Sequence, residues 1–283
     1  MKVIRAQKAG FCFGVALALR KLDMLVRQAH GLRVATFGEI IHNPTVLRSY
    51  ADQGVVCLED PAEATQDMAV LIRAHGIPRS VEEMLQKRVG LLQDTTCPKV
   101  KKAQLAIAEA TAGGARLFLY GETEHPEVQG LISYACGEKR IFSSFPELQA
   151  LAKEWYGGAV VLAAQTTQDR AQFEEMKRFL AAELQERLTV LDTICDATRQ
   201  RQEEISMLAR MSDAVVVVGG RSSGNTRRLA ELARMLDVPT MLVESEKELD
   251  PQFFSNAAVV ALTAGASTPR EIIDAVEERL LRM

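Results

Sequence analysis

The stretch Leu191-Asp192-Thr193-Ile194-Cys195-Asp196 has a counterpart earlier in the chain, at Asp94-Thr95-Thr96-Cys97-Pro98. Both read Asp-Thr-x-Cys, both follow a short apolar run, and both precede a long segment with helical periodicity. A third cysteine, Cys12 in Ala9-Gly10-Phe11-Cys12-Phe13-Gly14, stands in the same place, after Val3-Ile4 and before a helical segment. The chain therefore sets a thiol at the start of a helix three times, which indicates one metal centre built by three lobes.

Composition and length limit the classes of protein to which the chain can belong. Its 283 residues, 47% of them hydrophobic, are enough for two or three modest domains with buried cores. A net charge of −3 and an aromatic content of 5% do not favour a nucleic-acid binder. No apolar run reaches the length that crosses a membrane, and the strand-like start, residues 1–6, does not resemble a signal peptide.

The five cysteines do not suggest disulfides, because their number is odd and none of them form a Cys-x-x-Cys pair. Cysteines without an export signal are typical of the reducing cytoplasm. We therefore expect a cytoplasmic protein that binds neither nucleic acid nor membrane.

Apolar, β-branched runs alternate with amphipathic segments from one end of the chain to the other. This alternation predicts α/β architecture with mainly parallel sheets. The expected strands are residues 2–6, 33–37, 69–72, 89–93, 116–120, 140–142, 159–163, 189–191, 214–218, 240–243 and 258–262. The expected helices are residues 15–29, 44–52, 80–87, 98–111, 127–134, 146–151, 170–185, 198–209, 226–236 and 269–281.

Small polar clusters follow the expected strands, at the edge where open α/β sheets bind their ligands. Together with the cysteines they fall into three sets, each with one cysteine and two polar stations. In the first set, Cys12 goes with His42 and His75. In the second, Cys97 goes with one station formed by His125 and Glu127 and another at Thr166. In the third, Cys195 goes with one station formed by Ser223 and Asn225 and another at Ser267. This pattern predicts three similar lobes, residues 1–95, 96–192 and 193–283, packed about a common axis where the cysteines meet.

Three thiolates without a Cys-x-x-Cys pair suit either a catalytic zinc or a cubane iron–sulfur cluster. A helix start would favour the charged form of each thiol. The simpler interpretation is three buried structural cysteines, since free cysteine is commonly buried. Their matched positions favour the metal centre, whereas Cys57 and Cys136 lack this context and are expected to be packing or incidental residues.

Three histidines, His42, His75 and His125, lie in post-strand loops beside glycine or proline, where protonated rings would grip an anion. His30, in contrast, is expected to be a solvated helix cap. Ser223, Asn225 and Ser267 open helices after strands, a setting that suits phosphate oxygens as well as ordinary N-capping. The glycine-rich stretches match neither the Walker A nor the dinucleotide spacing, so ATP and NAD are not expected.

Glu127 lies two residues after His125 and is a candidate proton donor within reach of the Thr166 hydroxyl. The alternative is an ordinary acidic residue in a first helical turn, favoured there by the helix dipole. The residues alone favour that alternative.

Eight motifs in order carry a resemblance to a known family. They are Gly10-Phe11-Cys12-Phe13-Gly14-Val15, His42-Asn43-Pro44, Ala74-His75-Gly76, Asp94-Thr95-Thr96-Cys97-Pro98, His125-Pro126-Glu127-Val128, Gln165-Thr166-Thr167, Ser223-Gly224-Asn225 and Thr263-Ala264-Gly265-Ala266-Ser267. Together they resemble the 4-hydroxy-3-methylbut-2-enyl diphosphate reductase family, also called IspH or LytB, over essentially the whole chain.

The resemblance implies a trefoil of three α/β lobes around a four-iron, four-sulfur cluster held by Cys12, Cys97 and Cys195, with one iron left open. It also implies the last step of the non-mevalonate isoprenoid pathway. There the allylic alcohol diphosphate loses its hydroxyl with two electrons and two protons, giving isopentenyl and dimethylallyl diphosphates. The electrons would come from an external donor such as ferredoxin or flavodoxin.

The resemblance also implies roles for individual residues. Glu127 would be the proton source and Thr166 would contact the substrate hydroxyl, although Thr167 is a neighbour easily confused with it. Many family members have Ser-Ser-Asn where this chain has Ser223-Gly224-Asn225, so a contact at Gly224 would have to come from its backbone N–H. The diphosphate would be held by His42, His75, His125, Ser223, Gly224, Asn225 and Ser267.

Two other functions remain open at this point. A hydrolase or hydratase could use a three-thiolate zinc or a non-redox cluster, and it would need no electron donor. A non-catalytic metal sensor or phospholigand-binding module would bind without turnover, but the chain has no basic face that reads DNA.

Overall fold

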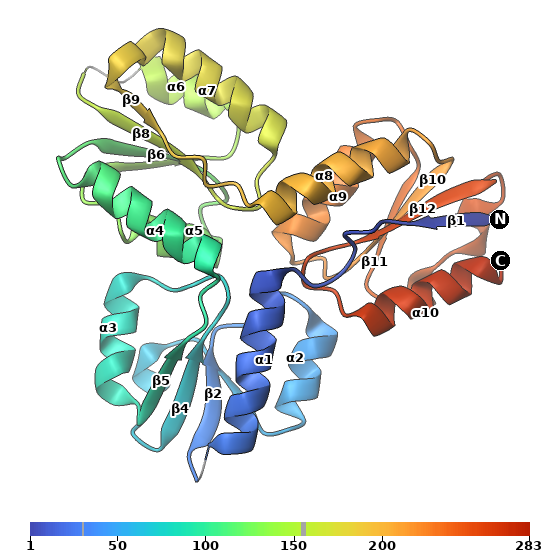
Figure 1. Cartoon of the computed structure of the whole chain (residues 1–283), viewed down its shortest axis with the longest axis horizontal. Coiled ribbons are helices and arrows are strands. Elements are labelled where there is room, and N and C mark those ends of the chain that lie inside the picture. The colour runs from blue at the N-terminus through green and yellow to red at the C-terminus, as the bar shows by residue number, and fades with distance from the viewer. Residues whose placement is uncertain (30, 154–156) are drawn as a thin grey trace. The chain divides into compact units, whose positions relative to one another are not determined.

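The computed structural model describes residues 1–29, 31–153 and 157–283 of the chain (Figure 1). Three four-stranded sheets, each wholly parallel, form the framework. We call them sheet A, in the order β1-β12-β10-β11, sheet B, in the order β3-β2-β4-β5, and sheet C, in the order β7-β6-β8-β9. His30, which the sequence predicts to be a solvated helix cap, lies outside the described residues, as does the single tryptophan, Trp155.

Sheet A joins the two ends of the chain. Its strands are β1 (Lys2–Arg5), β10 (Ala214–Val218), β11 (Thr240–Val243) and β12 (Val259–Ala264). Strand β1 pairs in parallel with β12, with Lys2 opposite Val259. Helices α8 (Asp196–Ala209) and α9 (Gly224–Arg234) cover one face, and α10 (Arg270–Leu281) covers the other. Both faces of β10 are therefore buried, which explains its unbroken apolar sequence.

Sheet B contains β2 (Arg33–Phe37), β3 (Val56–Leu58), β4 (Met68–Ile72) and β5 (Leu91–Asp94). Helix α3 (Arg79–Arg88) packs on one face through Leu85, which is fully buried among Phe37, Val70 and Ile72. Helices α1 (Phe13–Gln28) and α2 (Pro44–Ala51) precede β2 and β3 in the chain.

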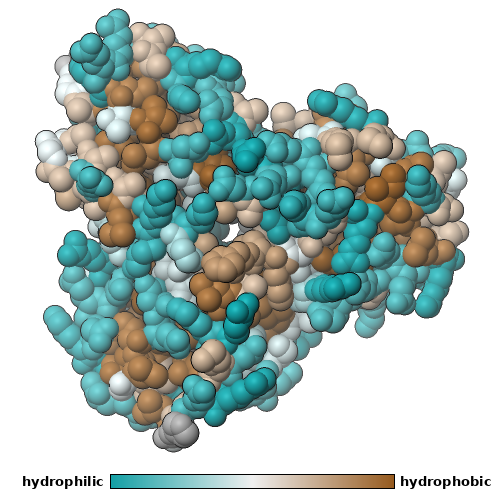
Figure 2. All heavy atoms as spheres, in the orientation of Figure 1, coloured by the Kyte–Doolittle hydropathy of each residue, from teal (hydrophilic) through white to brown (hydrophobic). Residues whose placement is uncertain are grey.

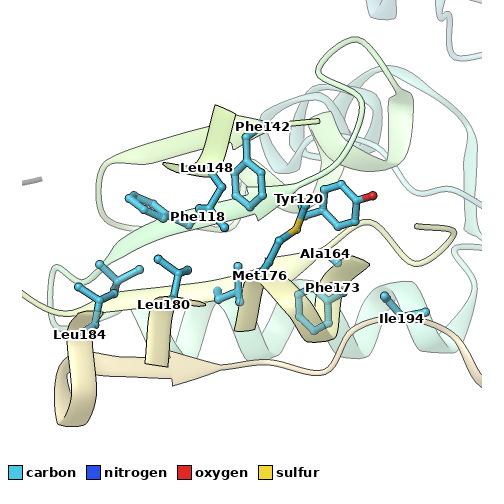
Figure 3. Packing of buried hydrophobic residues seen from close by; sticks show 12 residues of the cluster. Phe118, Tyr120, Phe142, Leu148, Ala164, Phe173, Met176, Leu180, Leu184 and Ile194 are labelled. Atoms are coloured by element: carbon cyan, nitrogen blue, oxygen red, sulfur yellow. The ribbon is translucent and has the colours of Figure 1, made fainter. Parts of the chain in front are cut away.

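Sheet C has two apolar cores, one on each face. Its strands are β6 (Arg116–Tyr120), β7 (Lys139–Phe142), β8 (Val160–Ala164) and β9 (Leu188–Val190). Helices α4 (Pro98–Thr111) and α5 (Pro126–Ile132) cover one face, and α6 (Phe145–Lys153) and α7 (Arg170–Leu184) cover the other. Figure 3 shows Phe173, Met176 and Leu180 of α7 packed against Phe118 and Tyr120 of β6.

The expected α/β class with parallel sheets is confirmed, and every expected helix and strand is present with ends within two residues of the expected ones. Strand β3 was not expected, because only one of its three residues is buried and no alternating pattern marks it. Short 3-10 turns at Pro61–Glu63, Gln185–Arg187, Glu246–Glu248 and Pro251–Phe254 were also not expected.

The first expected lobe, residues 1–95, is wrong at its beginning, because β1 pairs with β12 and so belongs to sheet A. The chain also divides into two compact units rather than three contiguous segments. Unit 1 comprises Met1–Ala16, Ile41–Gln53 and Asp196–Met283, and unit 2 comprises Leu17–Ile40 and Gly54–Cys195. Sheet A therefore lies in unit 1, and sheets B and C lie in unit 2.

On the face drawn in Figure 2, hydrophilic side chains predominate and hydrophobic ones are exposed in separate areas. Among the described residues, no helix is long and apolar enough to cross a membrane.

Replacing Phe173 by alanine removes a side chain that is 1% exposed in the core between α7 and sheet C. Because a cavity would remain, we expect the free energy of unfolding to fall by about 3–5 kcal/mol in urea denaturation followed by circular dichroism. Leu105→Ala on α4 is the control, since Leu105 is 58% exposed. It should change the value by less than about 0.5 kcal/mol, and equal losses in both variants would contradict this core.

Candidate active site

Each of the three expected cysteines lies directly before a helix. Cys12 precedes α1, Cys97 precedes α4, which has Pro98 at its first position, and Cys195 precedes α8. The placement inferred from sequence is therefore confirmed. All three are partly exposed, so they are not the fully buried packing residues of the simpler interpretation, whereas Cys57 and Cys136 are exposed.

One backbone hydrogen bond recurs at all three cysteines. The Cys97 N–H donates to the carbonyl of Ala74 at 2.9 Å, the Cys195 N–H to Thr166 at 3.0 Å, and the Cys12 N–H to Ala266 at 3.1 Å. In each case the acceptor is the second residue after the end of a central strand, namely β4, β8 and β12. Each thiol is thus held at the carboxyl edge of its sheet, where α/β proteins bind ligands.

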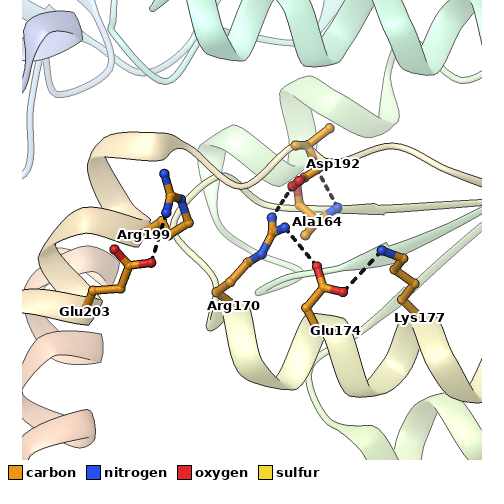
Figure 4. Close-up of polar contacts among 8 residues, drawn as sticks. Ala164, Arg170, Glu174, Lys177, Asp192, Arg199 and Glu203 are labelled. Atoms are coloured by element: carbon orange, nitrogen blue, oxygen red, sulfur yellow. Dashed lines mark hydrogen bonds and ion pairs between the residues drawn. The ribbon is translucent and has the colours of Figure 1, made fainter. Parts of the chain in front are cut away.

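The threonine of Asp-Thr-x-Cys fixes the segment that leads to the cysteine. The Thr193 hydroxyl donates to the carbonyl of Ala164 at 2.6 Å and accepts from the Ala164 N–H at 2.8 Å. The Thr95 hydroxyl donates in the same way to the carbonyl of Ile72, the last residue of β4. Figure 4 shows the neighbouring Asp192, which pairs with Arg170. The motif therefore docks its segment on the adjacent strand end.

The Cys12 sulfur accepts a hydrogen bond from the Val15 N–H in the first turn of α1, at 3.5 Å. The first N–H groups of a helix have no acceptor within the helix, so they are available to a sulfur atom or an anion placed before its first turn. The donor set of three cysteines, one of them held in this way, suits a soft metal or an iron–sulfur cluster.

The candidate ligands are divided between the units, with Cys12 in unit 1 and Cys97 and Cys195 in unit 2. Within the described ranges of the chain, no group of three or more histidine, cysteine, aspartate or glutamate side chains is arranged to hold a metal ion. The meeting of the three thiols at one centre thus stays a prediction.

Glu127 and Thr166 form a buried pair in unit 2. The Thr166 N–H donates to Glu127 Oε1 at 2.6 Å, and the Thr166 hydroxyl donates to Glu127 Oε2 at 3.0 Å. Glu127 is 2% exposed and Thr166 is 5% exposed. The contact expected between these two residues is present, and it is Thr166 rather than Thr167 that makes it.

Burial raises the pKa of Glu127 from 4.5 to about 7, and the two hydrogen bonds from Thr166 only partly oppose that rise. A carboxyl with this pKa holds a proton near neutral pH and can release it, as a general acid must. The proton would sit on Oε2, because Oε1 already accepts from a backbone N–H, which cannot reverse its role. Glu127 does lie in the first turn of α5, as the alternative interpretation predicts, but it is buried there rather than solvated.

Two expected anion-binding histidines, His75 and His125, lie close together, with ring centroids 5.5 Å apart and an interplanar angle of 86°. The Nδ1 of His125 accepts from the Glu127 N–H at 3.1 Å and so caps the start of α5. A ring nitrogen that accepts carries no proton, so His125 is neutral here and presents Nε2 as its donor. The expectation that His125 binds an anion stays a prediction, and Nε2 is the ring nitrogen available for it.

The other expected anion-binding residues lie in unit 1. Ser223 caps α9 by accepting from the Thr226 N–H, as the N-capping interpretation predicts. The Ser267 hydroxyl donates to the carbonyl of His42 at 3.2 Å. Asn225 is 6% exposed, and its side-chain Nδ2 is buried without a hydrogen-bond partner. An unsatisfied buried donor is costly unless a ligand accepts from it.

His42 belongs to unit 1, where its main chain passes close to Gly220. A Cβ added at Gly220 would lie 2.7 Å from the carbonyl oxygen of His42, so a larger residue at 220 would push the His42 segment away. The sequence offered no sign of this contact, because residues 42 and 220 are far apart along the chain.

Two arginines, the half-buried Arg73 and the buried Arg201, were also missed from the sequence. Arg73, just after β4, donates from Nε to the carbonyl of Gly76 at 3.4 Å, and burial lowers the pKa of its guanidinium. Arg201 on α8 is 5% exposed and donates to the carbonyl of Gly10 at 2.7 Å. Charged residues usually lie on solvated surfaces, and no local pattern marks either one as buried.

Comparisons with known proteins give consistent matches over the whole chain. The family model described as LytB protein matches residues 3–281. A protein of Desulfovibrio desulfuricans named 4-hydroxy-3-methylbut-2-enyl diphosphate reductase is 52% identical over 285 residues, which cover 99% of each chain. One of the same name from Geotalea daltonii is 40% identical over 285 residues, covering 99% of this chain and 97% of its own.

Solved structures agree with these matches. A structure titled (E)-4-hydroxy-3-methyl-but-2-enyl diphosphate reductase, the terminal enzyme of the non-mevalonate pathway, is 36% identical and has a TM-score of 0.70, with 100% of both chains covered. The reductase structure from Plasmodium falciparum has a TM-score of 0.91 at 23% identity, covering 98% of this chain and 87% of the other. At that identity the second likeness concerns the fold alone.

The raised pKa of Glu127 makes stability depend on pH. Below pH 4.5 the carboxyl is protonated in both the unfolded and the folded state; between pH 4.5 and about 7 it ionises only when unfolded. The free energy of unfolding of the metal-free wild type, relative to Glu127→Gln, should therefore fall across this window by at most about 3 kcal/mol and then level off. Urea denaturation at a series of pH values measures the difference.

The matched control is Glu124→Gln, since Glu124 is exposed in the loop that precedes α5. Its difference from the wild type should stay flat across the same window. A flat difference for Glu127→Gln as well would mean that Glu127 titrates like a solvated carboxyl.

Proposed function

This chain belongs to the LytB protein family, and from that premise we propose that it is a 4-hydroxy-3-methylbut-2-enyl diphosphate reductase. It removes the allylic hydroxyl of its substrate: the C–O bond breaks, two electrons and two protons enter, and water leaves. The products are isopentenyl diphosphate and dimethylallyl diphosphate. The proposal places the enzyme in the cytoplasm and gives it an external electron donor such as ferredoxin or flavodoxin.

The observation that carries the proposal is the double role of Thr166. Its N–H and hydroxyl hold the carboxylate of Glu127, while its carbonyl accepts from the N–H of Cys195. One residue therefore ties a proton-holding carboxyl to a thiol at the start of a helix. A reaction that breaks a C–O bond, protonates the departing oxygen and reduces the remaining carbon fragment needs this proximity of a redox ligand and an acid.

Cys12, Cys97 and Cys195 would hold a four-iron, four-sulfur cluster, and their chemistry fits that group. Three cysteines are one fewer than the four that bind a ferredoxin-type cluster, which leaves one iron for a substrate. When bound, the cluster supplies electrons one at a time and a Lewis-acidic iron. The exposed Cys57 and Cys136 have no part in this proposal.

Glu127 supplies the proton to the departing hydroxyl through Thr166. When Glu127 is protonated on Oε2, it donates to the Thr166 hydroxyl, which can then donate to the substrate oxygen. The fixed N–H bond to Oε1 keeps the carboxyl from turning away. Because the pair is buried, little water competes for this proton.

The diphosphate would be bound by neutral donors and helix starts rather than by a cluster of arginines. Asn225 Nδ2 is a buried donor that would gain a partner. Gly224 is the first residue of α9, and its N–H faces outward from a helix start, where anions bind well. This N–H would replace the serine that many relatives carry. The remaining proposed contacts are His42, His75, His125, Ser223 and Ser267.

Protein purified without oxygen should be brown and should contain about four iron atoms and four sulfides per chain. Replacing Cys12, Cys97 or Cys195 by serine should remove most of both, because serine is a poorer ligand for iron–sulfur clusters. The controls are Cys57→Ser and Cys136→Ser, which should retain the wild-type content. A colourless wild type with a single zinc atom would contradict the proposed cofactor.

The variant Glu127→Gln should keep its iron, its sulfide and its substrate affinity but lose turnover by about 100-fold to 10,000-fold, because the amide cannot supply the proton. Turnover is followed with reduced methyl viologen as electron donor under anaerobic conditions. Glu124→Gln, in the loop just before α5, should be as active as the wild type. Unchanged turnover of Glu127→Gln would remove Glu127 from the proton path, and wild-type turnover without any reductant would point to a hydratase instead.

A further inference from the structure

Helix α8 holds the loop that leads to Cys12 through two side chains one turn apart. The Glu204 carboxylate accepts from the N–H groups of Gln7 and Lys8, at 2.7 and 2.9 Å. Arg201 donates from Nη2 to the carbonyl of Gly10 at 2.7 Å. Residues three apart on a helix lie on one face, so the two side chains act on the same loop from one side. All of these residues belong to unit 1.

Arg201 has a second contact that makes it more than a loop anchor. Its Nη1 donates to the carbonyl of Ala197, in the first turn of α8, at 2.9 Å. One guanidinium thus spans a carbonyl two residues before Cys12 and a carbonyl two residues after Cys195. Its rigid fork of donors can hold both at once, which a lysine ammonium on a flexible stem cannot do as well.

Burial of this guanidinium makes its charge effective. Arg201 is 5% exposed, and a charge removed from water acts on its neighbours over a low effective dielectric constant. An arginine stays protonated at any pH that the protein tolerates, so the positive charge is permanent.

We propose that Arg201 is a positioning residue that fixes the Cys12 loop to the start of α8 and places a permanent positive charge at the Gly10 carbonyl, two residues before Cys12. This inference rests on the proposed cluster. A fixed Cys12 slows loss of iron, and a nearby positive charge favours the reduced cluster over the oxidised one, since reduction adds negative charge.

The test compares three variants of the anaerobically purified, cluster-loaded protein. Arg201→Met removes both the charge and the fork, and Arg201→Lys keeps the charge without the fork. Arg199→Met is the matched control, because Arg199 lies on the same helix but is exposed and pairs with Glu203 at the surface (Figure 4). Two properties are measured: the rate of iron release to a chelator, and the midpoint potential in a redox titration followed by electron paramagnetic resonance.

Both Arg201 variants should release iron about 10-fold faster or more, the usual scale for residues that orient metal ligands. Arg201→Met should also have a more negative midpoint potential, with one-electron reduction at least about tenfold less favourable. Arg201→Lys should stay near the wild-type potential, and Arg199→Met should match the wild type in both measurements. If Arg201 only supported the fold, its replacement would lower stability without giving the methionine and lysine variants different midpoint potentials.

The proposal is overturned if a folded Arg201→Met, checked by circular dichroism, keeps the wild-type potential and the wild-type rate of iron release. If Arg201→Met does not fold, Arg201→Lys decides: a wild-type rate of iron release in that variant overturns the positioning role. Failure of the wild type itself to take up iron and sulfide would instead overturn the proposed function, so the two failures are distinguishable.

Discussion

The hydrogen bond from a cysteine N–H to the second carbonyl beyond a strand end is the constraint on which the rest of the site depends. It occurs in all three sheets, from Cys12, Cys97 and Cys195, with lengths between 2.9 and 3.1 Å. A carbonyl beyond the last ladder bond needs a partner if it is to be buried. The cysteine N–H supplies it, and the same bond sets the thiol at the sheet edge, immediately before the first turn of a helix.

This constraint connects the proposed metal ligand Cys195 with the proposed proton donor Glu127. At Cys195 the acceptor is Thr166, whose other two polar groups hold Glu127. Thr166 therefore joins Glu127, whose burial raises its pKa to about 7, to the segment that carries the Cys195 thiol. A solvated carboxyl would be ionised at neutral pH and could not act as the acid. His125 caps α5 by accepting the Glu127 N–H at its Nδ1, so only its Nε2 can donate to a ligand.

The sequence predicted the elements well because each one carries its own hydrophobic period. Strand β10 is an unbroken apolar run because both of its faces are buried. Helix α7 is amphipathic because only one of its faces is buried. Strand β3 was missed because three mostly exposed residues show no pattern. The partner of β1 was missed because pairing of Lys2 with Val259 depends on the whole fold.

The site was predictable only in part. Helix starts mark the three cysteines, and strand ends mark the polar stations, so these positions could be read from periodicity. The choice of Thr166 over Thr167, the tautomer of His125 and the burial of Arg201 depend on contacts between distant segments. The matches to the LytB family over residues 3–281 support the function of the whole, but not the role of any one side chain.

The central claim is that three thiols, distant along the chain, hold one cofactor. Anomalous scattering measured at the iron absorption edge, from crystals grown without oxygen, tests this claim most directly. The account predicts one compact iron centre per chain whose protein ligands are the sulfur atoms of Cys12, Cys97 and Cys195. Iron bound to only one or two of these sulfurs, or bound through Cys57 or Cys136, would contradict it.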